Sequence, residues 1–337
     1  MINLAPLTPQ ITITADGQPF AMDRVLSVEI TDEAGFESDE LVITLDDAAP
    51  QIARPREGAK LTVAIGYRET GLVQFGTYVF EELAREGWPR ICTLTAKAAD
   101  HAKTLKEPKT RIWEKTTLAE IVETIAAEHN LQAQIAPALG ALAVPFLAQT
   151  EESDQNLLTR LGRRTGAVIT PKDQRLLVTA RHSGKTASGQ PMPALPVTPD
   201  MLITDRGYSI RLKPRARHSE IRARWRDRPA GRTKIVVLKT GLEGPSMTLR
   251  EVFQSEPEAQ KAADAAKRDM VAGEGEMELT LIGQPLARAE APVQVSGVSL
   301  DVDGNWIATS VTHEWAFKGG GARTTIRAEF GADSDEE

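Results

Sequence analysis

Short stretches of alternating apolar and polar residues dominate both ends of the chain, and each stretch predicts a half-buried β-strand. In the N-terminal third, turn residues separate five such stretches: 26–31, 41–45, 60–65, 76–83 and 91–96. The C-terminal part carries a second series: 220–225, 234–238, 293–296, 304–313 and 323–330. Both series close with an aromatic-containing strand, a glycine-containing turn and an alternating, threonine-rich strand. We interpret the two series as an internal duplication of one β unit.

The middle of the chain has the period of about 3.6 residues that is typical of helices. A capping-box pattern at Thr117–Glu120 predicts the start of a helix that ends near His129. Ser153 is the predicted N-cap of a second helix, and Gly166 can end that helix in the left-handed conformation. A short hairpin should follow over residues 167–179. Together these elements predict a compact α/β module.

These patterns predict a mainly β chain with an α/β insert. The predicted segments are a first β domain (1–103), a small α/β module with two helices (104–180), a proline- and glycine-rich connector (181–204), a second β domain (205–332) and an acidic tail (333–337). An alanine-rich helix over about 256–272 interrupts the second β domain. Its small apolar side predicts close packing against a flat surface such as a sheet.

Composition narrows the class of protein only modestly. A chain of 337 residues is long enough for two or three domains, and no stretch has the roughly 20 apolar residues of a membrane span. The single cysteine, Cys92, excludes an internal disulfide and favours assembly in a reducing cytoplasm. Because Cys92 falls on an alternating strand, we expect it to be buried and unreactive.

The sequence contains no recognisable catalytic or metal-binding motif. Its five histidines have no metal-ligand spacing: His101, His129, His182, His218 and His313. The stretch Asp301–Asn305 begins like a calcium loop, but Thr312 stands where the closing glutamate would be required. We expect a turn there instead. We therefore predict no catalytic residues, no cofactor and no metal, and we interpret the chain as a non-enzyme.

A row of arginines is the sharpest polar feature of the sequence. Strand alternation places Arg222, Arg224 and Arg226 on one face of a strand, and Arg228 should continue the row. We predict that these four residues form a charged interaction face for nucleic acid or for an acidic neighbouring subunit. A solvated strand face balanced by local carboxylates is an equal alternative. No recognition helix or zinc finger indicates sequence-specific DNA binding.

The middle block and parts of the C-terminal half closely resemble the phage late control protein D family, the baseplate hubs of contractile phage tails and R-type pyocins. The resemblance lies in the segments 105–114, 117–122, 125–129, 149–155, 157–167, 250–255, 281–285 and 304–313. It covers nearly the whole chain, and the middle block is specific because many positions match in order.

The resemblance implies a virion structural protein in the baseplate of a contractile injection system, assembled in the bacterial host cytoplasm. In such hubs each chain contributes two tube-like β-barrel domains, and a homotrimer forms a ring of six similar units. This ring is a symmetry adapter between the six-fold tail tube above and the three-fold spike below. The implied partners are the spike protein, a tail tube or tube-initiator protein and the tape-measure protein. Related type VI secretion spikes fuse the hub to a needle, so here we expect a separate spike protein.

The sequence leaves two other classes of function open. The α/β module at 104–180 resembles wall-binding folds loosely, which keeps a peptidoglycan-binding or peptidoglycan-hydrolysing tail component as an alternative. The arginine row keeps a DNA-binding regulator of late expression as another. The hub interpretation predicts that barrel strands of neighbouring copies complete a closed ring and so remove exposed strand edges.

Overall fold

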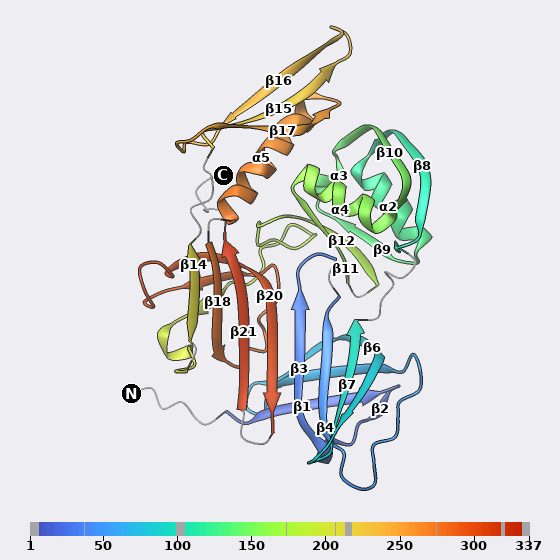
Figure 1. The fold of residues 1–337 in the computed structure, drawn as a ribbon, viewed down its shortest axis with the longest axis vertical. Helices are drawn as coiled ribbons and strands as arrows, with labels where there is room; N and C mark the ends of the chain where they lie inside the picture. Colours follow the sequence, from blue (N-terminus) through green and yellow to red (C-terminus); the bar gives the residue numbers. More distant parts are fainter. Residues whose placement is uncertain are drawn as a thin grey trace.

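The structure is a computed structural model, and it describes residues 7–36, 38–98, 105–172, 174–205, 207–212, 218–273, 275–317 and 321–331. The fold is mainly β, and in the described part of the chain the long helices lie between residues 118 and 165 and between residues 256 and 272 (Figure 1). The predicted acidic tail 333–337 and His101 lie outside the described residues. Within the described part of the chain, no helix is both long and apolar enough to cross a membrane.

The first β unit (residues 9–98) is a sheet that bends around an apolar core. In Figure 1, β1 crosses the direction of β3 and β4, so the sheet encloses its own inner face. Alternating residues of every long strand fill this core, in agreement with the period-2 pattern of the sequence. The elements are β1 (Pro9–Ala15), β2 (Gln18–Pro19), η1 (Met22–Arg24), β3 (Val25–Glu33), β4 (Glu40–Asp46), β5 (Lys60–Tyr67), β6 (Gly71–Glu86) and β7 (Ile91–Ala98).

The second β unit (residues 195–212 and 275–330) has its own core, centred on the buried Trp306. Part of the segment 181–204, predicted as a connector, contributes the strand β13 to this unit. The elements are β13 (Leu195–Val197), η2 (Pro199–Met201), β14 (Tyr208–Leu212), β18 (Gly275–Ile282), β19 (Pro292–Val295), β20 (Gly304–Ala316) and β21 (Gly321–Phe330).

The two units have the same strand order. In the first unit the order is β3-β4-β7-β6-β5, and in the second it is β14-β18-β21-β20-β19. All of these neighbours pair antiparallel, and the strands occur in the same sequence along the chain. The equivalent strands are therefore β3 and β14, β4 and β18, β5 and β19, β6 and β20, and β7 and β21.

The two units also share an irregularity in their longest strands. Both β6 and β20 contain a bulge, at Glu81 and at Thr309. Each extra residue lies five positions after a glycine, Gly76 in the first unit and Gly304 in the second. Because a bulge is a specific local feature of a strand pair, its occurrence at the same position supports the internal duplication.

The registers around the two bulges also agree residue by residue. Directly before each bulge, Phe80 pairs with Ala96, and Ala308 pairs with Ala328. A backbone hydrogen bond leaves each strand on the opposite side: the Phe80 amide donates to the Ala59 carbonyl at 2.9 Å, and the Ala308 amide donates to the Ala291 carbonyl at 3.0 Å. The internal duplication is therefore visible at the level of individual hydrogen bonds.

One part of the sequence prediction is wrong. The stretches 220–225 and 234–238 are strands, but they are not the counterparts of 26–31 and 41–45. They belong to a separate three-stranded sheet, inserted in the chain between β14 and β18. Alternating apolar residues occur in any half-buried strand, so the pattern could not distinguish an inserted sheet from the repeated one.

This insert (residues 220–272) consists of a sheet covered on one face by one helix. Its elements are β15 (Glu220–Asp227), β16 (Arg232–Lys239), β17 (Ser246–Phe253) and α5 (Glu256–Ala272). The helix packs through alanines against the sheet, as predicted from its alanine-rich side. Ser255 is its N-cap and accepts a hydrogen bond from the Glu258 amide.

The α/β module (residues 108–180) lies between the two β units in sequence. Its two longer helices begin at the predicted caps, Thr117 and Ser153, and Gly166 ends the second in the left-handed conformation with φ of 68°. A third, one-turn helix at Pro137–Gly140 was not predicted. The elements are β8 (Pro108–Thr117), α2 (Leu118–Glu128), β9 (Gln132–Ile135), α3 (Pro137–Gly140), β10 (Ala143–Ser153), α4 (Asp154–Thr165), β11 (Ala167–Lys172) and β12 (Arg175–Ala180).

The two β units join edge to edge through antiparallel pairing of β20 with β3, which we call the seam. It runs from the Ser310–Glu33 pair to the Ala316–Ser27 pair. Trp315 of β20 is fully buried in the core of the first unit, and its indole N–H donates to the Gly66 carbonyl at 3.2 Å. The two sheets are thereby one continuous hydrogen-bonded surface.

Candidate interaction surfaces

The arginine row lies on the face of the insert sheet that is opposite to α5. Ile221 and Ala223 of β15 are fully buried against the helix. Arg222 and Arg226 are exposed on the other face, and Arg224 is half-buried there. Strand alternation therefore gathers three of the four arginines on one face, and the role of this face in binding stays a prediction.

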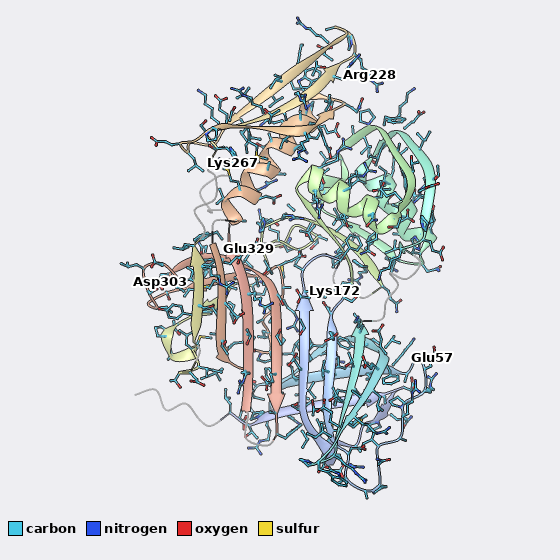
Figure 2. The ribbon with its side chains drawn as sticks, viewed as in Figure 1. Glu57, Lys172, Arg228, Lys267, Asp303 and Glu329 are labelled. Carbon is cyan, nitrogen blue, oxygen red and sulfur yellow. The ribbon has the colours of Figure 1, made fainter. Side chains whose placement is uncertain are left out.

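Arg228 does not continue the row within the strand, because β15 ends at Asp227. It lies in the following turn (Figure 2). Its guanidinium donates to the Gln254 side chain at 3.0 Å. Arg222 forms an ion pair with Glu220 at 3.0 Å. This pair is exposed, so it contributes little to stability and leaves most of the positive potential of the face in place.

Apolar side chains accompany the arginines on this face. Ile235 and Val237 of β16 are about half exposed and stand opposite Arg224 and Arg222 in the register of the sheet. Val252 of β17 is exposed on the other side of the row. A face that combines guanidinium groups with exposed aliphatic residues has the composition of a protein interface more than that of a surface that binds phosphates alone.

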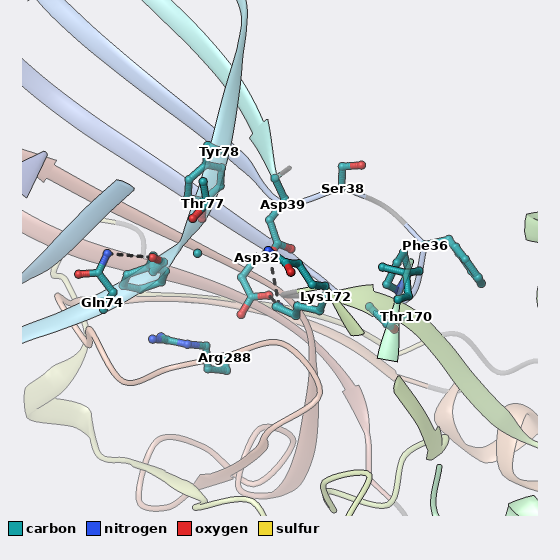
Figure 3. A pocket seen from close by; sticks show the side chains of 16 residues that line it. Asp32, Phe36, Ser38, Asp39, Gln74, Thr77, Tyr78, Thr170, Lys172 and Arg288 are labelled. Atoms are coloured by element: carbon teal, nitrogen blue, oxygen red, sulfur yellow. Dashed lines mark hydrogen bonds and ion pairs between the residues drawn. The ribbon is translucent and has the colours of Figure 1, made fainter. Parts of the chain in front are cut away.

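A second polar cluster lies where the two β units meet the α/β module (Figure 3). The ammonium of Lys172, from β11, forms ion pairs with Asp32 and Asp39 of the first unit. The second carboxylate oxygen of Asp32 accepts a hydrogen bond from the Ala289 amide of the second unit at 3.1 Å. Asp32 therefore connects three parts of the chain.

Burial and charge act in opposite directions in this cluster. Burial disfavours the ammonium of Lys172, but the attraction of Asp32 and Asp39 outweighs it and raises the pKa of Lys172. Burial raises the pKa of the Asp39 carboxyl. Arg288 of the second unit lies beside the cluster with its guanidinium 4.1 Å from the centre of the Phe75 ring. The surrounding cavity holds about 280 Å³.

The α/β module holds a third polar cluster, built around the fully buried Asp154 at the start of α4. Its carboxylate contacts Lys109 at 2.7 Å, Arg111 at 2.5 Å and the His129 ring at 2.9 Å. Glu128 bridges the same two cations. The grouping of Glu128, His129 and Asp154 has the ligand types of a metal site, but two cations already neutralise its carboxylates. We interpret it as a structural ion-pair network.

His313 and Cys92 have structural surroundings, and the burial of Cys92 agrees with the prediction from the sequence. His313 is fully buried at the seam, and its ring nitrogens contact the Thr324 hydroxyl and the Ala287 carbonyl, each at 3.2 Å. Burial lowers the pKa of His313 to about 3. Cys92 is fully buried in the first core, and burial raises the pKa of its thiol.

Sequence reasoning missed both ion clusters, although it identified the arginine row. Lys172 lies 140 positions from Asp32, and Arg111 lies 43 positions from Asp154. No local spacing connects such residues, because only the fold brings them together. The arginine row was visible because three of its four members, Arg222, Arg224 and Arg226, alternate along one strand.

Comparisons with known proteins agree with one another. A sequence model of the family described as "Phage tail baseplate hub (GPD)" matches residues 54–318. The chain is 30% identical to the "Probable baseplate hub protein" of Escherichia phage 186, over 98% of this chain and 97% of the relative. It is 31% identical to the protein of the same description from Escherichia phage P2, over 91% of this chain and 90% of the relative.

The fold is also found among solved structures. The 43 kDa tail protein of prophage MuSo2 from Shewanella oneidensis superposes with a TM-score of 0.69 at 17% identity, over 95% of this chain and 98% of that chain. The duplicated β units, the module between them and the sequence similarity along almost the whole chain lead to one assignment. This chain belongs to the phage tail baseplate hub family, and it is a structural component of the virion baseplate.

Proposed function

We propose that this hub acts as a homotrimeric symmetry adapter between the six-fold tail tube and the three-fold spike. The observation that carries the proposal is the matched strand order and register of the two β units. Two equivalent units in each of three chains give six similar surfaces around one axis, while the chain as a whole repeats three times. The α/β module and the insert occur once per chain and provide the three-fold surfaces.

The proposed role requires no catalysis. The hub binds a separate spike protein on one side and a tail tube or tube-initiator protein on the other, with the tape-measure protein as a further partner. The particle is a phage or a headless, pyocin-type tail, since both need the same adapter. A peptidoglycan hydrolase is the rival enzyme class, and loss of turbidity in a peptidoglycan suspension treated with purified hub would favour that rival.

We assign the face of Arg222, Arg224 and Arg226 to an acidic neighbouring subunit. The exposed Ile235 and Val237 beside it support a protein partner, because apolar side chains add little to contacts with phosphates. Binding of DNA that weakens with salt, and that disappears when these arginines become serine, would favour the rival role as a regulator of late expression.

The test of the adapter is the mass and symmetry of the full chain. Light scattering of concentrated protein should give three times the 36.6 kDa chain mass. Electron-microscopic class averages should show rings with six similar lobes around a central hole. A monomer at every concentration, or a ring with a number of lobes other than six, would overturn the proposal.

A further inference from the structure

The internal duplication leaves two strand edges whose equivalents are paired elsewhere in the same chain. Within the chain, β20 of the second unit pairs with β3 of the first unit at the seam. The equivalent of β3 is β14, and the equivalent of β20 is β6. Among the described residues, no strand covers the outer edge of β14 or the side of residues 82–86 that faces away from β7.

These two edges are exposed in ways that a monomer tolerates poorly. Tyr208 and Leu212 of β14 are 44% and 50% exposed, whereas their equivalents in β3, Val28 and Asp32, are almost completely buried. A strand edge with apolar side chains and unpaired backbone groups is a template for pairing with another chain. In Figure 1, β14 lies on the left of the second unit and β6 lies on the right of the first unit.

The backbone of β14 is oriented for an outside partner. The Thr280 amide donates to the Gly207 carbonyl, so residues 207, 209 and 211 direct their backbone groups toward β18. Residues 208, 210 and 212 therefore direct their N–H and C=O groups outward. At the seam the same alternation holds, because the Phe317 amide donates to the Leu26 carbonyl and β3 residues of the same parity as Leu26 face β20.

The loop that follows the second strand of each unit leaves the β6 edge open. At the seam, His313 contacts the Ala287 carbonyl of the loop after β18. Arg85, at the equivalent position of β6, donates to the Ile52 carbonyl of the loop after β4. The loop after β18 contacts β20 in this way and still allows β3 to pair with it. The equivalent loop after β4 therefore also permits a strand beside residues 82–86 of β6.

We propose that β14 of one chain pairs antiparallel with residues 82–86 of β6 in a second copy, in the register of the seam. Leu212 then pairs with Leu83, and Ile210 pairs with Arg85. Transfer of the seam register fixes these partners, as the equivalent seam pairs are Asp32 with Val311 and Ile30 with His313. The contact is head to tail, so repeated application closes a ring or extends a filament. The inference rests on the homotrimer proposed above only for the number of chains.

Charge complementarity supports this register. Arg211 faces Ala84 of the second copy, and Glu82 and Glu86 lie diagonally on either side of it on the same face. A register shifted by one residue would move Arg211 to the opposite face from the glutamates. Arg85 is already ion-paired with the buried Asp47 at 3.1 Å, so its charge is compensated when the edge becomes covered.

Paired cysteines in the full chain test the register. Glu86 and Ser209 form a predicted pair in which the backbones do not exchange hydrogen bonds, which brings side chains closest and suits a disulfide. The variant Glu86→Cys with Ser209→Cys should cross-link between chains under mild copper-catalysed oxidation by air. The control, Glu82→Cys with Ser209→Cys, separates the thiols by about 13 Å along the strand, so it should cross-link at least about tenfold less. The wild-type Cys92 is buried and stays as a common background.

The product sizes separate this inference from the adapter proposal. A discrete covalent trimer from the matched pair supports both. A ladder beyond three chains supports the edge pairing and overturns the trimer. A trimer by mass that cross-links equally well through both pairs, or through neither, overturns the register and leaves the trimer intact. A monomer without cross-links overturns both.

Discussion

The two β units share a strand order and a register, yet their edges have opposite environments. In the seam, His313 of β20 is fully buried against β3, whereas its equivalent in β6, Arg85, is exposed. Val28 of β3 is fully buried, whereas Tyr208 of β14 is exposed. One scaffold thus carries a core-like edge where the chain pairs with itself and a partly polar edge that no strand of the described residues covers. The difference teaches that the burial and polarity of side chains at equivalent positions depend on what pairs with the strand edge, and not on the place of the strand in the repeated unit.

The largest effect should come from removing the tryptophan that crosses the seam. Trp315 belongs to the second unit in sequence but fills the core of the first. Trp315→Ala should lower the free energy of unfolding by about 3–5 kcal/mol, because a large cavity replaces a fully buried ring. Chemical denaturation followed by circular dichroism measures this loss.

Trp306→Ala is the matched control, since Trp306 is equally buried but lies wholly within the second core. Both variants should lose similar stability. Only Trp315→Ala should also speed hydrogen exchange in β3, the strand across the seam. Equal exchange in β3 for the two variants would mean that Trp315 does not hold the units together.

A smaller loss of stability should follow from removing the cation of the cluster formed by Lys172, Asp32 and Asp39. Lys172→Met leaves Asp32 and Asp39 close together without a cation, and Asp32 is almost fully buried. Because water reaches about a third of the Lys172 side chain, we expect a loss of about 2 kcal/mol, below the range for fully buried pairs. Thermal unfolding at neutral pH measures it.

The double variant Lys172→Met with Asp39→Asn should recover part of this loss, because it removes the uncompensated charge as well as the ammonium. If it were less stable than Lys172→Met alone, the repulsion between the two carboxylates would not be the cause of the loss.

His313 should make the stability of the protein depend on pH. Its folded pKa is about 3, below the value of about 6.5 in an unfolded chain, so the unfolded state binds the proton more readily. The resulting stability is fully present above about pH 6.5. It falls as the pH drops toward the folded pKa, by about 1.4 kcal/mol per pH unit from this residue.

His313→Gln can keep hydrogen bonds to the Thr324 hydroxyl and the Ala287 carbonyl without titrating. The difference in unfolding free energy between wild type and this variant, measured from pH 7 to pH 4, isolates the histidine from the carboxylates. Parallel curves would show that His313 is not buried in its neutral form.

The sequence predicted those parts of the fold that depend on neighbouring residues. The caps at Thr117 and Ser153, the left-handed Gly166 and the alternating strands are local, and all are confirmed. The assignment of 220–225 to the repeated unit was wrong, because periodicity reports burial on one face and not the identity of the partner strand. The matching bulges become visible only once the pairing partners are known.

The candidate sites divide in the same way. Alternation along one strand was enough to place Arg222, Arg224 and Arg226 on a common face. The cluster of Lys172 with Asp32 joins residues from different units, and no sequence spacing encodes such a contact.

The smallest effect on chain stability should come from a proline on the uncovered edge. Ile210 directs its N–H away from β18, so Ile210→Pro removes no hydrogen bond within the chain. Edge strands accept proline at such positions. We expect the unfolding free energy of a dilute monomer to change by less than about 1 kcal/mol. Assembly into a ring should be lost, which sedimentation of concentrated protein would show.

The neighbouring position provides the contrast, since the Ser209 N–H faces β18 and is used within the second unit. Ser209→Pro should therefore destabilise the monomer, by about 3 kcal/mol if its cost matches that of a proline within a helix. Alternation of the two effects along one strand would show that the outer side of β14 serves assembly and the inner side serves folding. Rings that form normally with Ile210→Pro would mean that the uncovered edge of the second unit, unlike the covered edge of the first, has no strand as its partner.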